Sequence, residues 1–282
     1  MKFGVNTFLF TSPFTNDSIS LFPKFKKWGF DGVEIAIEDV SHVTPSLIRK
    51  ALDDNGLQCS SSCAALGEGR DLRGSVKDQN TALDYLKSML DIMPELGAPV
   101  LIGPLYSCVG RAEFVETEER KAQWETVVGH FRTLSDRAEK LGVKMAIEPL
   151  NRYETDFINT VDQALKMIED VGSDALTVLL DSYHMNIEEK DPAKAILKAG
   201  SKIGHFHACG SDRGTPGGDQ INWTNIHAAL EKVNYSGSIV IESFTTDVKV
   251  IAKAASIWRD FEPSQEDIAI NGLKFLKTLF KN

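Results

Sequence analysis

The chain is poor in cysteine and has no long apolar run. Its cysteines form no Cys-x-x-Cys pair and do not have the spacing of a zinc ribbon; they are Cys59, Cys63, Cys108 and Cys209. No hydrophobic stretch approaches the ~18 residues of a membrane-spanning helix, and the N-terminus lacks the pattern of a secretory signal peptide. We therefore expect a reduced, cytoplasmic protein that does not bind membranes.

Basic residues are also scarce relative to acidic ones. The 31 Lys and Arg face 40 Asp and Glu, which gives a net charge of -9. Such a balance argues against nucleic acid as a partner, because a phosphate backbone is attracted by basic surfaces. No Gly-x-Gly-x-x-Gly follows the first apolar run, so a dinucleotide-binding fold has little support.

What the sequence does contain is a regular alternation of short apolar runs and longer amphipathic segments. The predicted strands are 3–8, 32–37, 57–65, 99–103, 143–148, 176–181, 202–207 and 238–242. The predicted helices are 17–28, 44–55, 77–96, 117–141, 160–171, 191–199, 222–233 and 264–280. Strict alternation implies parallel strands with right-handed crossovers. Eight units in 282 residues predict a (β/α)8 TIM barrel over residues 1–282, one α/β domain, with an open doubly wound sheet as the alternative.

Four consecutive predicted strands end on a side chain that can bind a metal. These residues are Glu148, Asp181, His207 and Glu242. In a barrel the carboxyl ends of neighbouring strands meet on one rim, where active sites lie. Three carboxylates and one imidazole suit Mn²⁺, Mg²⁺ or Co²⁺ better than a thiolate-type zinc site. The alternative, that these acids merely end strands in water, explains a single ending better than four in succession.

Further polar residues follow these strand ends at short range. Glu154 lies six residues after Glu148, and His184 lies three after Asp181. Arg213 stands in a glycine-rich loop that can turn its side chain inward. All three are candidates for contact with a substrate, although a loop arginine is more often solvated.

Other polar residues have more ambiguous interpretations. His205 alternates with His207 on one strand, so we expect a hydrogen-bonded histidine one layer deeper in the barrel. Glu34 either forms a salt bridge within the barrel, which we favour, or orients a metal ligand. The loop 66–75 resembles an insertion on the active face, and Arg152 has no interpretation from the sequence.

At these residues the chain resembles the D-tagatose/D-psicose (allulose) 3-epimerase family of the xylose isomerase-like barrels. The resemblance extends over the whole chain and is strongest at 147–155 (IEPLNRYET), 180–186 (LDSYHMN), 205–207, 211–214 and 241–244. Segments 103–107 and 257–260 also match the family pattern. The resemblance supports the barrel and implies an isomerase acting on a ketose.

The resemblance also implies roles for individual residues. Glu148, Asp181, His207 and Glu242 would bind one divalent metal, with Mn²⁺ the first expectation and Co²⁺ or Mg²⁺ the others. Glu148 and Glu242 would be the acid and base, and the ketose would be held near O1–O3 by Glu154, His184 and Arg213. Many family members have an aromatic residue where this chain has Asn6. We expect Asn6 and Phe244 to line the sugar site, while the preferred ketose is left open, and we expect a homodimer or homotetramer.

The expected reaction inverts C3 of a free ketose through an enediolate, which interconverts pairs such as D-fructose and D-psicose or D-tagatose and D-sorbose. Inversion needs a base on one face of the carbon and an acid on the other. An aldose–ketose isomerase of the hydroxypyruvate isomerase type would use the same groups. A sugar-phosphate epimerase would need a phosphate pocket, for which Arg70, Arg73, Arg111 and Arg259 are available. An endonuclease would need more histidines and a basic groove, and a metal-free sugar-binding barrel is the non-enzymatic alternative.

Overall fold

The strands close into a barrel in which each strand is parallel to its neighbours. The computed structural model describes residues 1–281, and within them the order is β1 to β8, with β8 pairing back to β1. The strands are β1 (Lys2–Asn6), β2 (Gly32–Ile37), β3 (Gln58–Ala64), β4 (Val100–Gly103), β5 (Lys144–Ile147), β6 (Leu176–Asp181), β7 (Ile203–Ala208) and β8 (Ser238–Ile241). The predicted TIM barrel is thereby confirmed.

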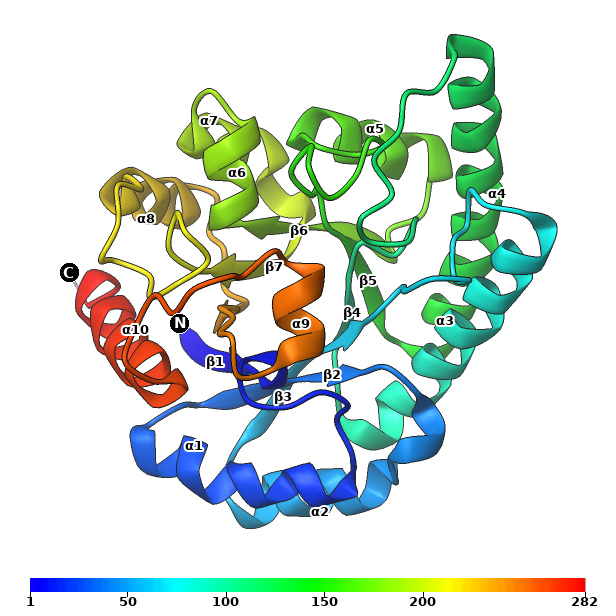
Figure 1. Cartoon of the computed structure of the whole chain (residues 1–282). Helices are drawn as coiled ribbons and strands as arrows, with labels where there is room; N and C mark the ends of the chain where they lie inside the picture. Colours follow the sequence, from blue (N-terminus) through cyan, green and yellow to red (C-terminus); the bar gives the residue numbers. More distant parts are fainter. Residues whose placement is uncertain (282) are drawn as a thin grey trace.

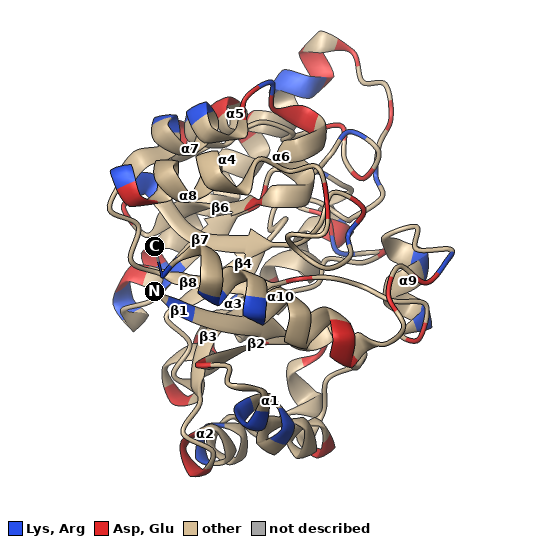
Figure 2. Cartoon of the chain, turned by 90° about the vertical axis from the view of Figure 1, so that its left-hand side faces the viewer, with Lys and Arg blue, Asp and Glu red and all other residues tan. Residues whose placement is uncertain are grey.

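Helices surround this barrel in chain order (Figure 1). The α-helices of residues 1–281 are α1 (Phe22–Trp28), α2 (Pro45–Asp54), α3 (Val76–Leu96), α4 (Thr117–Leu141), α5 (Val161–Val171), α6 (Ser182–Glu188), α7 (Pro192–Ala199), α8 (Trp223–Lys232), α9 (Lys249–Ala254) and α10 (Gln265–Leu279). Short 3₁₀ helices are η1 (Thr7–Leu9), η2 (Asn16–Leu21), η3 (Val40–His42) and η4 (Gly200–Lys202). Figure 1 shows α9 inside the ring, and Figure 2 shows it projecting beyond one end of the barrel.

The strands are buried on both faces because side chains fill the barrel and helices cover its outside. Within β2, for example, every residue from Gly32 to Ile37 is buried. The helices that precede β5 and β6 end on Gly142 and Gly172 with φ of 68° and 77°. These are left-handed conformations that glycine adopts without a Cβ penalty, so the glycines end the helices where the sequence predicts.

The N-terminal segment differs from its prediction in two places. The helix predicted over 17–28 is a 3₁₀ helix to Leu21 followed by α1, because Pro23 lacks an N–H and fits only the first turn of an α-helix. The first strand ends at Asn6 instead of residue 8, since the Asn6 side chain caps η1 by accepting from the Phe8 N–H. The helices α6 and α9 were not predicted from the sequence.

Charges of both signs are interspersed along the outer helices on the side drawn in Figure 2. The distribution agrees with the moderate net charge of -9. None of the helices in residues 1–281 combines the length and the apolar character that crossing a membrane requires.

Candidate active site

Four buried side chains from adjacent strands converge at the carboxyl end of the barrel. Asp181 is the last residue of β6, and His207 is the last but one of β7. Glu148 and Glu242 directly follow β5 and β8. Each of the four offers a nitrogen or oxygen atom within 4.8 Å of the others. His207 Nδ1 lies 3.0 Å from Glu242 Oε2, 3.7 Å from Asp181 Oδ2 and 3.8 Å from Glu148 Oε1. The sequence therefore predicted which residues meet.

Glu34 of β2 orients the ring of His207 from deeper inside the barrel. His207 Nε2 lies 2.9 Å from Glu34 Oε1, and His205 Nε2 lies 2.7 Å from Glu34 Oε2. A carboxylate accepts, so Nε2 of His207 carries a proton toward Glu34, and Nδ1 is the nitrogen that faces the three acids and that can bind a cation once its own proton is lost. Glu34 is thus both the barrel-layer partner that we favoured and the residue that orients a candidate ligand. His205 is the deeper, hydrogen-bonded histidine that the sequence predicted.

The electrostatics of the cluster reflect burial opposed by close charges. Burial alone would raise the pKa of Asp181, but Arg213 and His207 outweigh it and hold that pKa well below its usual range. Burial raises the pKa of Glu148, and the nearby Glu242 adds to the effect. Burial would lower the pKa of His207, yet Glu242 and Glu34 raise it well above its ordinary value. The site therefore has an excess of negative charge that favours a cation.

The backbone of Glu148 is fixed by two neighbours. Its N–H donates to the carbonyl of Gly103 at 3.1 Å, and its own carbonyl accepts from the hydroxyl of Tyr106 at 2.7 Å. Gly103 has a φ of 123°, a conformation that residues with a Cβ rarely adopt. Tyr106 was missed as a site residue, because an aromatic after a strand usually indicates core packing.

His184 presents a proton donor toward the cavity. Its Nδ1 accepts from the backbone N–H of Asn151 at 3.0 Å, so the proton is on Nε2. That Nε2 lies 3.7 Å from Glu148 Oε1. The Asn151 side chain also donates to Glu154 Oε1 at 2.8 Å, which holds Glu154 beside His184. The sequence analysis did not assign Asn151 to the site, although a residue three positions before Glu154 in the same short loop can reach its carboxylate.

Arg213 spans two of the acids, as its loop conformation permits. Its φ is 70°, and its Nη1 and Nη2 donate to Asp181 Oδ2 at 2.5 Å and to Glu242 Oε2 at 2.9 Å. The guanidinium stacks between the rings of Tyr183 and Phe244, at 4.9 Å and 4.7 Å. The sequence predicted an inward-facing arginine, and the structure adds that it neutralises part of the cluster.

Unpaired buried atoms test whether the site fits a metal. Among residues 1–281, Glu148 Oε1, His184 Nε2 and His207 Nδ1 are buried and make no hydrogen bond. Native proteins rarely leave such atoms unpaired unless a ligand or ion satisfies them. Because carboxylate oxygens and the Nδ1 atom of His207 converge here, the residues fit a hard divalent cation, which would take the place of the proton on Nδ1.

A cavity of about 350 Å³ opens directly above this cluster. Glu148, Glu154, His184, Arg213 and Glu242 line it together with Phe244. Its walls also include residues of the 66–75 loop and, from α9, Val250, Ile251 and Ala254. Asn6 is fully buried and is not among the lining residues; it lies behind Glu242, to which it donates at 2.8 Å.

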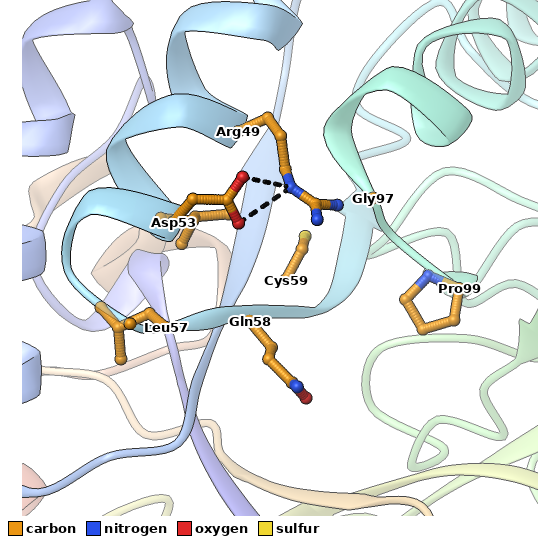
Figure 3. Close-up of a pocket in the computed structure, with 9 residues that line it drawn as sticks. Arg49, Asp53, Leu57, Gln58, Cys59, Gly97 and Pro99 are labelled. Carbon is orange, nitrogen blue, oxygen red and sulfur yellow. Dashed lines mark hydrogen bonds and ion pairs between the residues drawn. The ribbon is translucent and has the colours of Figure 1, made fainter.

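A second cavity, of about 540 Å³, lies at the opposite end of the barrel (Figure 3). It is lined by the end of α2, the start of β3 and the turn between α3 and β4. Its main polar groups are already paired, since Arg49 Nε donates to both carboxylate oxygens of Asp53 at 3.1 and 3.0 Å. The smaller cavity at the carboxyl rim is the candidate active site, because the convergent acids lie there.

The structure also accounts for Arg152. Its guanidinium and backbone N–H donate to the carboxylate of Glu188 in α6, at 2.8–3.1 Å. Arg152 is not among the residues that line the cavity, and it joins the loop after β5 to α6. Its role is therefore structural.

A parallel eight-stranded barrel with acids and an imidazole on its carboxyl rim defines a class of metal-capable barrel enzymes. The family described as "Xylose isomerase-like TIM barrel" matches residues 22–279. The chain belongs to the xylose isomerase-like TIM barrel family.

Similar proteins within that family include ketose 3-epimerases, as the sequence resemblance predicted. A "Probable ketose 3-epimerase" of Synechocystis sp. is 35% identical over 100% of this chain and 97% of its own length. The D-psicose 3-epimerase of Enterocloster bolteae is 29% identical over 99% and 96% of the two chains. A crystal structure of the D-allulose 3-epimerase of Methylomonas sp. in complex with D-allulose has a TM-score of 0.91 at 26% identity, covering 99% of this chain and 96% of that one.

Proposed function

We propose that the protein is an isomerase that inverts C3 of free ketoses. The observation that carries the proposal is the pair Glu148 and Glu242, which line one cavity but follow strands separated by β6 and β7. Two carboxylates reaching a cavity from separate strands can address opposite faces of one carbon atom. Similarity to ketose 3-epimerases along the whole chain supports the same reaction.

In this mechanism Glu148 and Glu242 move the proton. One carboxylate takes the C3 proton to give an enediolate, and the other returns a proton to the opposite face. In the reverse direction the two exchange roles. The donor on His184 Nε2 and the guanidinium of Arg213 would stabilise the charge that develops on the substrate oxygens. Glu154 would hold the sugar beside them.

We further propose that Glu148, Asp181, His207 and Glu242 hold one divalent cation, with Mn²⁺ preferred and Co²⁺ or Mg²⁺ as substitutes. When bound, such a cation supplies a Lewis acid that polarises the ketone and is worth several kcal/mol. The unpaired Nδ1 of His207 and Oε1 of Glu148 support this donor set. Metal analysis of the purified protein distinguishes this proposal from a metal-free sugar-binding barrel.

The experiment that tests the proposed function is a screen of free ketohexoses and ketopentoses with Mn²⁺ present or chelated. Chromatography of the products should show C3 epimers, and only with metal. Aldoses as products would favour an aldose–ketose isomerase instead. An absence of turnover with every ketose, in protein that binds Mn²⁺, would contradict the proposal.

Of the four arginines considered for a phosphate pocket, Arg70 lines the cavity and the other three do not, and all four already have partners within the protein, which supports a free sugar. Arg70 donates to the carbonyl oxygens of Glu38 and Ala65 and stacks on Tyr85. Arg73 and Arg111 form ion pairs with acids outside the cavity, and Arg259 stacks on Phe261. A phosphorylated ketose should therefore be a poorer substrate than the free sugar.

We also propose that the chain forms a homodimer or homotetramer and acts in the cytoplasm. Exposed apolar side chains such as Phe114 and Trp258, 91% and 73% exposed, support association. The four free thiols fit a reducing compartment. Light scattering on the purified protein tests the assembly, and a monomeric mass would contradict it.

A further inference from the structure

Asn6 lies at the end of β1, is fully buried, and uses every hydrogen-bonding group of its carboxamide. Its Nδ2 donates to Glu34 Oε1 at 2.7 Å and to Glu242 Oε1 at 2.8 Å, and its Oδ1 accepts from the Phe8 N–H at 2.7 Å. The nitrogen faces two acceptors and the oxygen faces a donor. The orientation of the amide is therefore determined by chemistry.

Glu34 extends this contact to the imidazole that faces the acids. Its Oε1 accepts from Asn6 and His207, and its Oε2 accepts from Ser61 and lies 2.7 Å from His205 Nε2. Four donors satisfy a carboxylate that has no exposed surface. Asn6 therefore joins Glu242 to the pair of Glu34 and His207 in one buried chain of hydrogen bonds.

The two oxygens of Glu242 have different partners. Oε2 lies 3.0 Å from His207 Nδ1 and accepts from Arg213, whereas Oε1 accepts from Asn6. Removing Asn6 would leave Oε1 without this donor and would free the carboxylate to rotate. The same change would remove one of the four donors that hold Glu34 in place. Both effects reach the cavity through other residues, because Asn6 does not line it.

We propose that Asn6 is a positioning residue, which fixes the carboxylate of Glu242 and, through Glu34, the direction of the His207 Nδ1 lone pair. The inference rests on the proposed function for the role of Glu242 in proton transfer. It does not depend on that function for the effect on metal binding, since outer partners of a metal ligand control affinity directly.

The test compares Asn6→Leu, which keeps the volume, with Asn6→Ala, which removes the same two donors without adding bulk. Titration of the metal-free proteins with Mn²⁺ should give a Kd weakened about 10–100-fold, and kcat for the ketose should fall by a similar factor. KM should change less than kcat, because Glu154 and His184 keep their contacts and Arg213 still donates to Asp181. Ser62→Ala is the matched control. Its buried hydroxyl donates to the Ile35 carbonyl and takes no part in the hydrogen bonds that link Asn6, Glu34, His207 and Glu242, so the Kd for Mn²⁺ and kcat should stay at wild-type values.

Wild-type Mn²⁺ affinity and kcat in a folded Asn6→Leu or Asn6→Ala variant would overturn the proposal. So would losses in Ser62→Ala as large as those in the Asn6 variants, because they would indicate a general packing effect. If the wild-type protein turned over no ketose, the proposed function would fail, but the Mn²⁺ titrations would still decide whether Asn6 orients the site.

Discussion

At the scale of single residues, the candidate site depends on polar atoms that the fold buries without a partner. Within the described residues these include Glu148 Oε1, His184 Nε2 and His207 Nδ1, and all three face the same space. Leaving such atoms unpaired costs roughly 1–3 kcal/mol each, so the folded chain is destabilised at this site until a ligand binds. These atoms are therefore placed in advance for a ligand, at the expense of the stability of the unliganded fold.

Replacing Glu148 by Gln tests the proton carrier. The amide keeps the shape but can neither accept the C3 proton nor donate it as an acid, so kcat should fall by about 10²–10⁴-fold. Chromatographic assay of C3 epimerisation gives the rate, and circular dichroism should show an intact barrel. Glu118→Gln, on the exposed surface of α4, is the control with unchanged activity. Full activity in Glu148→Gln would remove this residue from the mechanism.

The individual residues at the strand ends could be predicted because position along a strand determines them. A parallel strand places its last residue on the rim, so Asp181 and Glu242 needed no knowledge of the rest of the fold. Asn6 and Glu34 could not be assigned in this way. Their roles depend on contacts with His207 and Glu242, some 170 to 240 positions away in the chain, and no local pattern encodes such contacts.

At the scale of elements, α6 and α9 were missed because each is short. α6 begins directly after β6, and Asp181 caps it by accepting from the Tyr183 N–H at 2.6 Å. Asp181 thus both ends β6 and caps α6, so the sequence contains no loop residues that would indicate where the strand stops and the helix starts. With 7 and 6 residues, α6 and α9 are too short to show a clear helical period.

The contact between Arg152 and α6 predicts a small effect. Arg152→Ala should destabilise the protein only slightly, because the guanidinium is mostly exposed and the backbone N–H still bonds Glu188. Thermal melts and ketose kinetics measure this, and kcat should not change. A large loss of kcat in Arg152→Ala would instead indicate that this loop contacts the substrate.

Asp156, in the loop after β5, forms ion pairs that connect this loop with the loops after β3 and β4. Its carboxylate pairs with the buried Arg73 of the 66–75 loop and with Arg120 of α4, while Arg73 also donates to the Arg111 carbonyl. Asp156→Asn leaves Arg73 buried without a counter-charge, which should cost roughly 3–5 kcal/mol near neutral pH. Urea unfolding measures the loss, and Asp136→Asn, at an exposed position of α4, is the control.

The same pair predicts how this stabilisation depends on pH. Burial would raise the pKa of Asp156, but hydrogen bonds from Arg73 and Arg120 outweigh it and lower that pKa below its usual value. The stabilisation is therefore complete above the unfolded-state pKa of about 3.9 and is lost as the pH falls below it. The difference between wild type and Asp156→Asn should shrink in acid, and a constant difference down to pH 3 would contradict this assignment.

At the scale of the whole molecule, the barrel closes on itself, so a change at the rim is expected to affect global unfolding. Chelation should lower Tm by several degrees, since a ligand at 100 times its Kd stabilises by about 2.7 kcal/mol. Differential scanning fluorimetry with and without Mn²⁺ measures the shift. In His207→Ala the Mn²⁺-dependent rise should disappear, and a rise equal to that of wild type would place the metal elsewhere.

The cavity draws on the two halves of the chain for different purposes. The first four β/α units contribute wall residues such as Phe8, Leu66 and Val109, whereas the proposed acids, imidazoles and arginine all lie in or after β5 to β8. Substitution in the first half can therefore reshape the wall, as long as the residues there that hold the reacting groups are kept. Recombining first halves among related barrels should exchange sugar preference while the chemistry is inherited unchanged, provided that Asn6, Glu34, Gly103 and Tyr106 are retained.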